Sequence, residues 1–163
     1  MGDLCVAIVN LGSINADLVY RLHRFPKPGE TIAAGVRTQG LGGKGANQSV
    51  AIASAGGYGR HVGCVGEDGL WLIATLRSRG VDVDCIRTLD GASGHAVIYV
   101  DASAENSIVL YEGANQRIDV TQITGALAQC GSGDWLVAQN ETNLVQDAAR
   151  TAREAGLKVA YSA

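Results

Sequence analysis

The chain has 163 residues, of which 47% are hydrophobic and 18% are charged, which is enough apolar material for one core of ordinary size. The 13 basic and 16 acidic residues give a net charge of −3, and no basic stripe indicates binding to nucleic acid or to an anionic membrane. The N-terminus lacks the basic flank of a signal peptide, and its apolar run is too short to span a bilayer. We therefore expect a globular, cytoplasmic protein that binds small neutral or acidic molecules.

The cysteines and histidines give no sign of a metal site or a disulfide framework. Cys5, Cys64, Cys85 and Cys130 contain no C-x-x-C pair, so we expect buried, reduced thiols. The three histidines are isolated from one another and from any nucleophile. We expect His61 to be an ordinary surface imidazole, and we expect no metal to bind this chain.

Apolar runs alternate with helical segments in the first half of the chain. The predicted strands span residues 4–11, 31–38 and 61–65, and the predicted helices span residues 46–55 and 70–79. Glycines follow both helices, as is typical of helix ends. This alternating order favours a parallel sheet with right-handed crossovers.

The second half begins with a change of pattern. Residues 95–101 and 107–112 are rich in β-branched and aromatic residues and predict a hairpin. With 31–38 they can form a small separate sheet, in which Tyr99 and Tyr111 either cover a ligand or simply pack. A ligand lid and an ordinary edge hairpin both remain open at this point.

The remaining elements return to the alternating pattern. In order, we predict a helix capped by Asp119 or Thr121 and reaching about 130, a strand over 134–139, a helix capped by Thr142 or Asn143, and a strand over 157–161. Gly156 ends the second of these helices.

The most informative stretch is 41–57, in which a glycine-rich turn leads directly into an alanine-rich helix. Glycines at 42, 43 and 45 allow the backbone to approach a bound molecule closely. Lys44 and Asn47 stand three residues apart, so both can project from one side of the first turn. We expect the unpaired N–H groups of this helix start to suit an oxygen-rich ligand.

Asn15 and Asp17 form a second polar group, just beyond the carboxyl end of the first predicted strand. They share a face if the segment is extended, and open α/β sheets bind ligands at this position. The alternative is a simple turn, because both residue types bond their own backbone well.

Two nucleotide motifs can be tested against the glycine run. The phosphate-binding P-loop fails, because Thr38 and Gly45 stand where glycine and Ser or Thr are required. Residues 40–45 do match G-x-G-x-x-G, and Glu67 lies roughly twenty residues further on. A dinucleotide-binding enzyme therefore stays open as an alternative.

Four segments together resemble the ribokinase branch of the PfkB carbohydrate kinases, and the resemblance covers essentially the whole chain in order. They are Gly12-Ser-Ile-Asn15-Ala-Asp17, Gly42-Gly-Lys-Gly-Ala-Asn47-Gln, Val65-Gly-Glu-Asp68 and Gln139-Asn-Glu141. The resemblance implies a three-layer α/β/α sandwich with a small β-sheet lid, whose strands lie within about 15–42 and 94–112. Residues 1–163 would form the N-terminal part of this one domain, and a homodimer would form through the lid or an exposed sheet.

The resemblance also implies a sugar site. Its residues would be Asn15, Asp17, Gly42, Gly43, Lys44, Asn47 and Glu141. The chemistry agrees, because a carboxylate can accept hydrogen bonds from two sugar hydroxyls while amide and ammonium groups donate to sugar oxygens. Trp71 stands where the family commonly has glycine, and Glu67 and Asp68 are expected to be loop acids without a catalytic role.

The implied reaction is transfer of the ATP γ-phosphoryl group to a primary hydroxyl of ribose or a related sugar, assisted by Mg²⁺ and often by a monovalent cation. The family's catalytic base and anion hole lie in a motif of the form Asp-Thr-x-Gly-Ala-Gly-Asp, which this sequence lacks. We therefore expect the chain to be the sugar-binding half of a kinase, to contain no catalytic residue and to bind no ATP alone. A non-catalytic sugar-binding or regulatory module is the other alternative.

Overall fold

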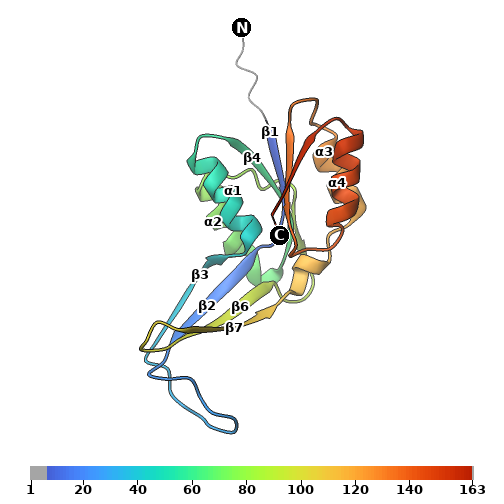
Figure 1. Cartoon of the computed structure of the whole chain (residues 1–163). Coiled ribbons are helices and arrows are strands. Elements are labelled where there is room, and N and C mark those ends of the chain that lie inside the picture. Colours follow the sequence, from blue (N-terminus) through green and yellow to red (C-terminus); the bar gives the residue numbers. More distant parts are fainter. Residues whose placement is uncertain (1–6, 163) are drawn as a thin grey trace.

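The computed structural model describes residues 7–162, so Cys5 and the start of the strand predicted over 4–11 lie outside the described residues. The larger of two sheets is parallel, with the strand order β5-β4-β1-β8-β9 (Figure 1). Its strands are β1 (Ala7–Leu11), β4 (Tyr58–Gly66), β5 (Ile86–Leu89), β8 (Trp135–Gln139) and β9 (Lys158–Ser162). The parallel order predicted from the alternating pattern is confirmed.

Helices cover both faces of this sheet, so the predicted three-layer α/β/α arrangement is confirmed as well. The helices are α1 (Lys44–Ser54), α2 (Leu70–Ser78), α3 (Val120–Leu127) and α4 (Val145–Glu154). Figure 1 shows α1 and α2 on one side of the sheet and α3 and α4 on the other. Gly80 and Gly156 follow α2 and α4 with φ of 83° and 85°, so these two helices end at left-handed glycines as expected.

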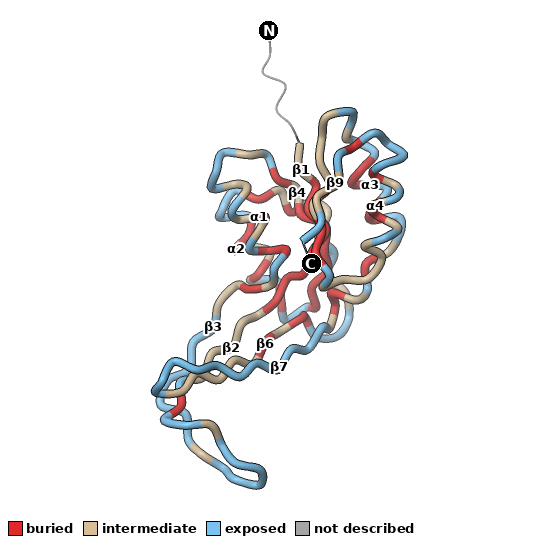
Figure 2. Tube along the Cα trace, in the orientation of Figure 1, coloured by how far each residue is buried: buried red, intermediate tan, exposed pale blue. Residues whose placement is uncertain are grey.

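Two clusters of buried side chains hold the layers together. On the α3 and α4 face, Leu11 and Leu136 of the sheet belong to one cluster with Ile123 and Ala148. On the other face, a second cluster joins the sheet to α1 and α2. Many residues of the central strands are accordingly buried (Figure 2).

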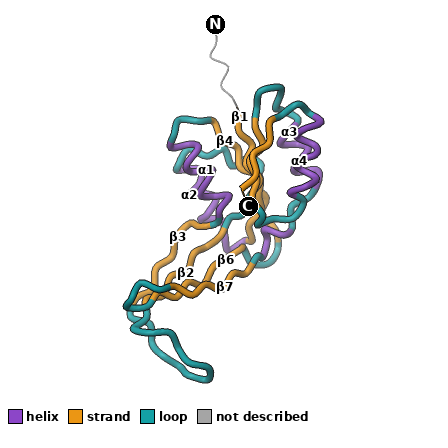
Figure 3. Tube along the Cα trace, in the orientation of Figure 1, coloured by secondary structure: helices purple, strands orange, loops and turns teal. Residues whose placement is uncertain are grey.

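The smaller sheet extends away from the layered body (Figure 3). Its order is β3-β2-β6-β7, with β2 (Asn15–Arg21), β3 (Val36–Gly42), β6 (Gly94–Val100) and β7 (Asn106–Tyr111). The hairpin predicted in the second half is confirmed, because β6 and β7 pair in antiparallel fashion. Every residue of β7 is exposed, so one outer strand of this sheet is uncovered.

Two strands differ from the sequence prediction. The strand expected over 31–38 begins only at Val36 and runs through the glycines to Gly42, because its register is set by pairing with β2, with Gly42 opposite Asn15. Strand β5 was not predicted, since its four residues are too few to show a pattern, and only Ile86 and Leu89 are partly buried.

The burial of His61 and the start of α4 differ from expectation. His61 is fully buried rather than exposed, because hydrogen bonds at both ring nitrogens replace solvent. Neither Thr142 nor Asn143 caps α4, which starts after Leu144 in a left-handed conformation. The Asn143 amide instead bonds the backbone N–H and carbonyl of Ile118.

The cap predicted for α3 is confirmed for Asp119, one of the two candidates. Its carboxylate accepts the N–H of Gln122 at 2.8 Å.

Candidate functional site

Three chain segments far apart in sequence meet beyond the carboxyl ends of β1 and β8. The loop after β1 contacts the start of α1 through the Ala46 N–H and the Ser13 carbonyl, at 2.9 Å. Glu141, just past β8, joins both: its Oε2 accepts from Ser13 Oγ at 2.5 Å and from the Lys44 N–H at 3.2 Å. The convergence brings together residues 15–17, 42–47 and 141, which are the predicted site segments.

The glycine turn between β3 and α1 is shaped by close contacts. A Cβ on Gly42 would lie 2.1 Å from the Asp17 Oδ1, and a Cβ on Gly43 would lie 2.7 Å from the Ser13 carbonyl oxygen. Gly43 also has a φ of 92°, which L side chains rarely adopt. Both positions therefore require glycine in this arrangement.

The N–H groups at the start of α1 are not free, which corrects the expectation from sequence. The Lys44 N–H donates to Glu141, the Gly45 N–H to Ser13 Oγ at 3.5 Å and the Ala46 N–H to the Ser13 carbonyl. These partners come from distant segments, so the sequence around the helix gave no sign of them. A ligand here must be recognised mainly by side chains.

Lys44 and Glu141 form an ion pair, with 3.2 Å between Nζ and Oε1 and side-chain exposures of 58% and 19%. Burial raises the pKa of Glu141, but the Ser13 hydroxyl, the Lys44 N–H and the Lys44 ammonium together outweigh burial and hold that pKa below its usual value. Glu141 is thus an ionised carboxylate with most of its acceptor positions already filled.

The pKa of Asp17 is shifted in the opposite direction to that of Glu141. Its carboxylate lies against Gly42 on the half-buried face of β2, and no hydrogen-bond donor within residues 7–162 stabilises its charge. Burial raises its pKa, and the nearby negative charge of Glu141 raises it further. Asp17 therefore presents two oxygen atoms that can accept hydrogen bonds from a ligand.

The two asparagines differ in their surroundings. Asn15 is 5% exposed, and its Oδ1 accepts from Asn115 Nδ2 at 2.7 Å, so its amide orientation is fixed. Asn115, between β7 and α3, also accepts the Ile14 N–H at 2.9 Å. Asn47 is exposed on the first turns of α1.

Sequence reasoning missed two residues that build this site. Ser13 lies inside the segment 12–17 that carries part of the family resemblance. The structure gives it a role, because its hydroxyl donates to the Glu141 carboxylate. Asn115 stands in no motif, and only the fold reveals that it orients Asn15.

The loop that contains Glu67 and Asp68 has a structural role. Asp68 Oδ1 accepts from the Ser93 N–H at 2.9 Å and from Ser93 Oγ at 2.7 Å. These bonds tie the end of β4 to the start of β6 through Asp68.

Within residues 7–162, no group of three or more His, Cys, Asp or Glu side chains is placed to hold a metal ion. None of the helices described there is long and apolar enough to cross a membrane.

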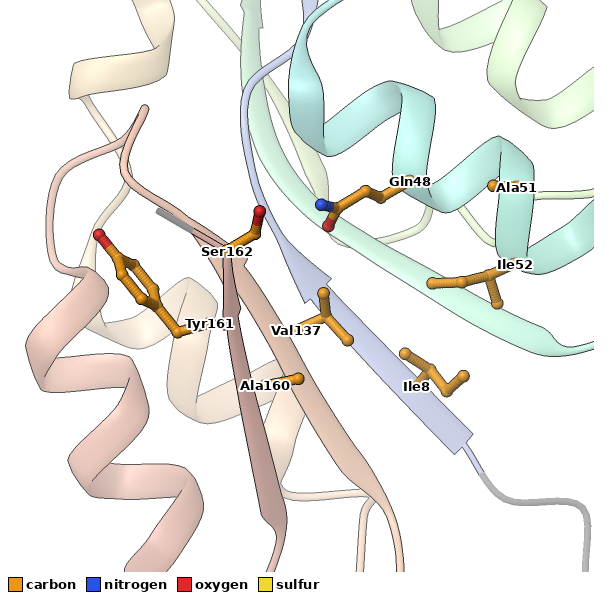
Figure 4. A pocket seen from close by; sticks show the side chains of 8 residues that line it. All are labelled: Ile8, Gln48, Ala51, Ile52, Val137, Ala160, Tyr161 and Ser162. Carbon is orange, nitrogen blue, oxygen red and sulfur yellow. The ribbon is translucent and has the colours of Figure 1, made fainter.

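An apolar groove lies apart from the predicted site, between α1 and the edge strand β9 (Figure 4). Ile8, Ile52, Val137 and Ala160 line it, with Gln48 at one end. None of the predicted sugar contacts lines this groove. Its mainly aliphatic lining suits packing against another apolar surface.

Comparison with known proteins identifies the family. A family model described as "pfkB family carbohydrate kinase" matches residues 7–162. The chain is 40% identical over 154 residues to a ribokinase of Haemophilus influenzae, covering 91% of this chain and 50% of that protein. The chain thus spans about half the length of the curated relatives it matches.

Solved structures give the same result. A ribokinase of Cryptococcus neoformans in complex with ADP superposes with a TM-score of 0.80 at 35% identity, covering 96% of this chain and 49% of its own. The Arabidopsis thaliana ribokinase complexed with ribose and ATP has a TM-score of 0.83 at 30% identity, with coverage of 96% and 52%. The chain therefore belongs to the pfkB family of carbohydrate kinases.

Proposed function

We propose that this chain is the sugar-binding half of an ATP-dependent sugar kinase that phosphorylates a primary hydroxyl of ribose or a related sugar. The observation that carries the proposal is the Asp17 carboxylate, which is half-buried and lacks a donor within residues 7–162. It stands beside an ion pair that its neighbours hold in place. The relative from Arabidopsis, whose structure is described with ribose and ATP, supports the choice of sugar.

Each predicted contact has a chemical role in this proposal. Asp17 accepts hydrogen bonds from two neighbouring hydroxyls, and Lys44 and Asn47 donate to sugar oxygens. Asn15 donates through Nδ2 while Asn115 holds its Oδ1. Glu141 lies on the opposite side of the proposed sugar site. A sugar lacking one of the bonded hydroxyls would leave a buried group unpaired, at a cost of about 1–3 kcal/mol.

We assign phosphoryl transfer to polypeptide other than residues 7–162. The first N–H groups of α1 are occupied by Glu141 and Ser13, and no acidic cluster within 7–162 suits Mg²⁺. The residues present therefore do not fit a nucleotide with its metal. ATP, Mg²⁺ and any monovalent cation would be bound by a complete kinase.

Calorimetric titration with ribose tests sugar binding. We expect saturable binding at one site and weaker binding of 2-deoxyribose, whose missing hydroxyl leaves a contact unpaired. NADH fluorescence titrated in parallel tests the dinucleotide alternative, for which the occupied helix start offers no support. NADH binding without ribose binding would contradict the proposal.

A phosphoryl-transfer assay with labelled ATP tests the second part. The purified chain should not phosphorylate ribose, whereas adding a separately produced C-terminal half of a ribokinase should restore transfer. Restoration would also argue against a non-catalytic module, and transfer by the chain alone would contradict the assignment.

A further inference from the structure

A network of polar side chains lies buried behind the site. It consists of Asn10 on β1, Ser49 on α1, His61 on β4 and Gln139 on β8, each 0% exposed. These four residues, the buried network, are not among the proposed sugar contacts. Because buried polar groups are costly unless they are paired, four of them in one place need an explanation.

Hydrogen bonding assigns the protons at its centre. His61 Nε2 lies 3.1 Å from the Gly12 carbonyl, which can only accept. Nε2 therefore carries the proton, and Nδ1 accepts from Ser49 Oγ at 2.8 Å. Ser49 Oγ in turn accepts from Asn10 Nδ2, which donates its other hydrogen to the Gly45 carbonyl, both at 2.8 Å.

The network also reaches the third segment of the site. Gln139 Nε2 donates to Asn10 Oδ1 at 2.8 Å and to Gln48 Oε1 at 2.6 Å. Gln139 is two residues from Glu141 and ends β8. Its Oε1 packs against Gly12, where a Cβ would lie 2.2 Å away, so no side chain fits between them.

The network bonds the carbonyls of Gly12 and Gly45, which lie on the two sides of a close backbone contact. A Cβ on Gly45 would lie 2.5 Å from the Gly12 Cα, so the loop after β1 and the first turn of α1 touch there. His61 bonds the first segment and Asn10 bonds the second. The network therefore bonds both of the segments that carry Asp17 and Lys44.

We propose that the buried network positions the sugar site, by holding the backbone segments that carry Asp17, Lys44 and Glu141 in one arrangement. The inference rests on the proposed function, because it takes sugar as the ligand. In this proposal the network residues make no contact with the sugar and act through the backbone of the segments they join.

Ser49→Ala is the sharpest test, since it removes a donor to His61 and an acceptor for Asn10 in one small change. Ribose affinity, measured by calorimetry well below each variant's melting temperature, should fall by about tenfold. Ser54→Ala, at an exposed position of the same helix, should change affinity by less than about twofold. Ser49→Thr keeps the hydroxyl and should restore most of the affinity.

A second readout separates positioning from plain stabilisation. The Ala46 N–H bonds the Ser13 carbonyl across the contact, so Ser49→Ala should speed its hydrogen exchange more than that of the β1 amides. A lower melting temperature with unchanged ribose affinity would overturn the proposal. If the unsubstituted chain bound no ribose, the proposed function would fail, and unchanged exchange at Ala46 would then overturn the network's role as well.

Discussion

Asp17 and Glu141 are neighbouring carboxylates whose surroundings shift their pKa values in opposite directions. Glu141 is held by a hydroxyl, a backbone N–H and an ammonium group, so its charge is balanced inside the protein. The charge of Asp17 is opposed by burial and by Glu141 itself. An acceptor kept without donors is typical of a site that a ligand completes.

Replacing Asp17 with Asn should separate binding from stability. Ribose affinity should fall by at least about tenfold, because hydrogen bonds to a charged acceptor contribute roughly 1.5–3 kcal/mol. The melting temperature should stay the same or rise slightly, since an unbalanced charge is removed. Asp147→Asn is the matched control, because Asp147 pairs with Arg150 on the exposed face of α4. Equal affinities in the two variants would contradict the role of Asp17.

His61 should make stability depend on pH. Burial lowers its pKa from the usual 6.5 to about 4, although its bond to Gly12 acts in the opposite direction. The unfolded chain therefore binds the proton first, so the free energy of unfolding should decrease as pH falls from 6.5 towards 4, by about 3 kcal/mol in total. Above pH 6.5 this contribution is fully present.

Urea unfolding of the protein and of His61→Gln at pH 7 and pH 4.5 isolates this effect, because the other titrating groups are shared. The variant should lose less stability between the two pH values. Identical losses would show that His61 is not the group responsible.

The β3–α1 turn carries three of the proposed sugar contacts, and the sequence predicted the outline of this turn. Glycines at 42 and 43 indicated a close approach, and the structure shows that the approach is to Asp17 and to the Ser13 carbonyl. The start of β3 and the occupied helix N–H groups were missed, because both depend on partners elsewhere in the chain. His61 was misjudged for the same reason, since its partner Ser49 lies on another element.

Two glycines of β3 provide a matched pair. A Cβ on Gly42 would collide with the Asp17 carboxylate, whereas a Cβ on Gly40 would meet nothing within 4 Å. Gly42→Ala should therefore displace Asp17 and weaken ribose binding by about tenfold or more, at a cost of at least 1.4 kcal/mol. Gly40→Ala should bind ribose like the unsubstituted chain. Calorimetry of both variants checks this, and equal affinities would contradict the contact.

Strand β7 is the element best suited to the homodimer that the family resemblance implies. Its Ile108, Val109, Leu110 and Tyr111 are 48–61% exposed, on an edge strand that pairs only with β6 within residues 7–162. Sedimentation should show a dimer that Ile108→Lys weakens. Val120→Lys, an equally exposed valine on α3, should leave the dimer intact. A monomer at all micromolar concentrations would contradict this surface.

The chain spans about half the length of the ribokinases it matches, and part of its surface is apolar. At β9 the parallel sheet has no further strand within residues 7–162, and the apolar groove of Figure 4 lies beside this strand. Parallel sheets are normally covered on both faces. These features support the proposal that phosphoryl transfer needs additional polypeptide, whereas the proposed sugar contacts lie within residues 15–141.

The most direct measurement is a ribose titration followed through the backbone amide resonances of the chain. We predict saturable shifts concentrated at residues 15–17, 42–47 and 141, where three distant segments converge. Residues of the groove in Figure 4, such as Ile8 and Ala160, should be unaffected. Shifts centred on that groove, or no shifts at all, would contradict the central claim that this chain forms a sugar site.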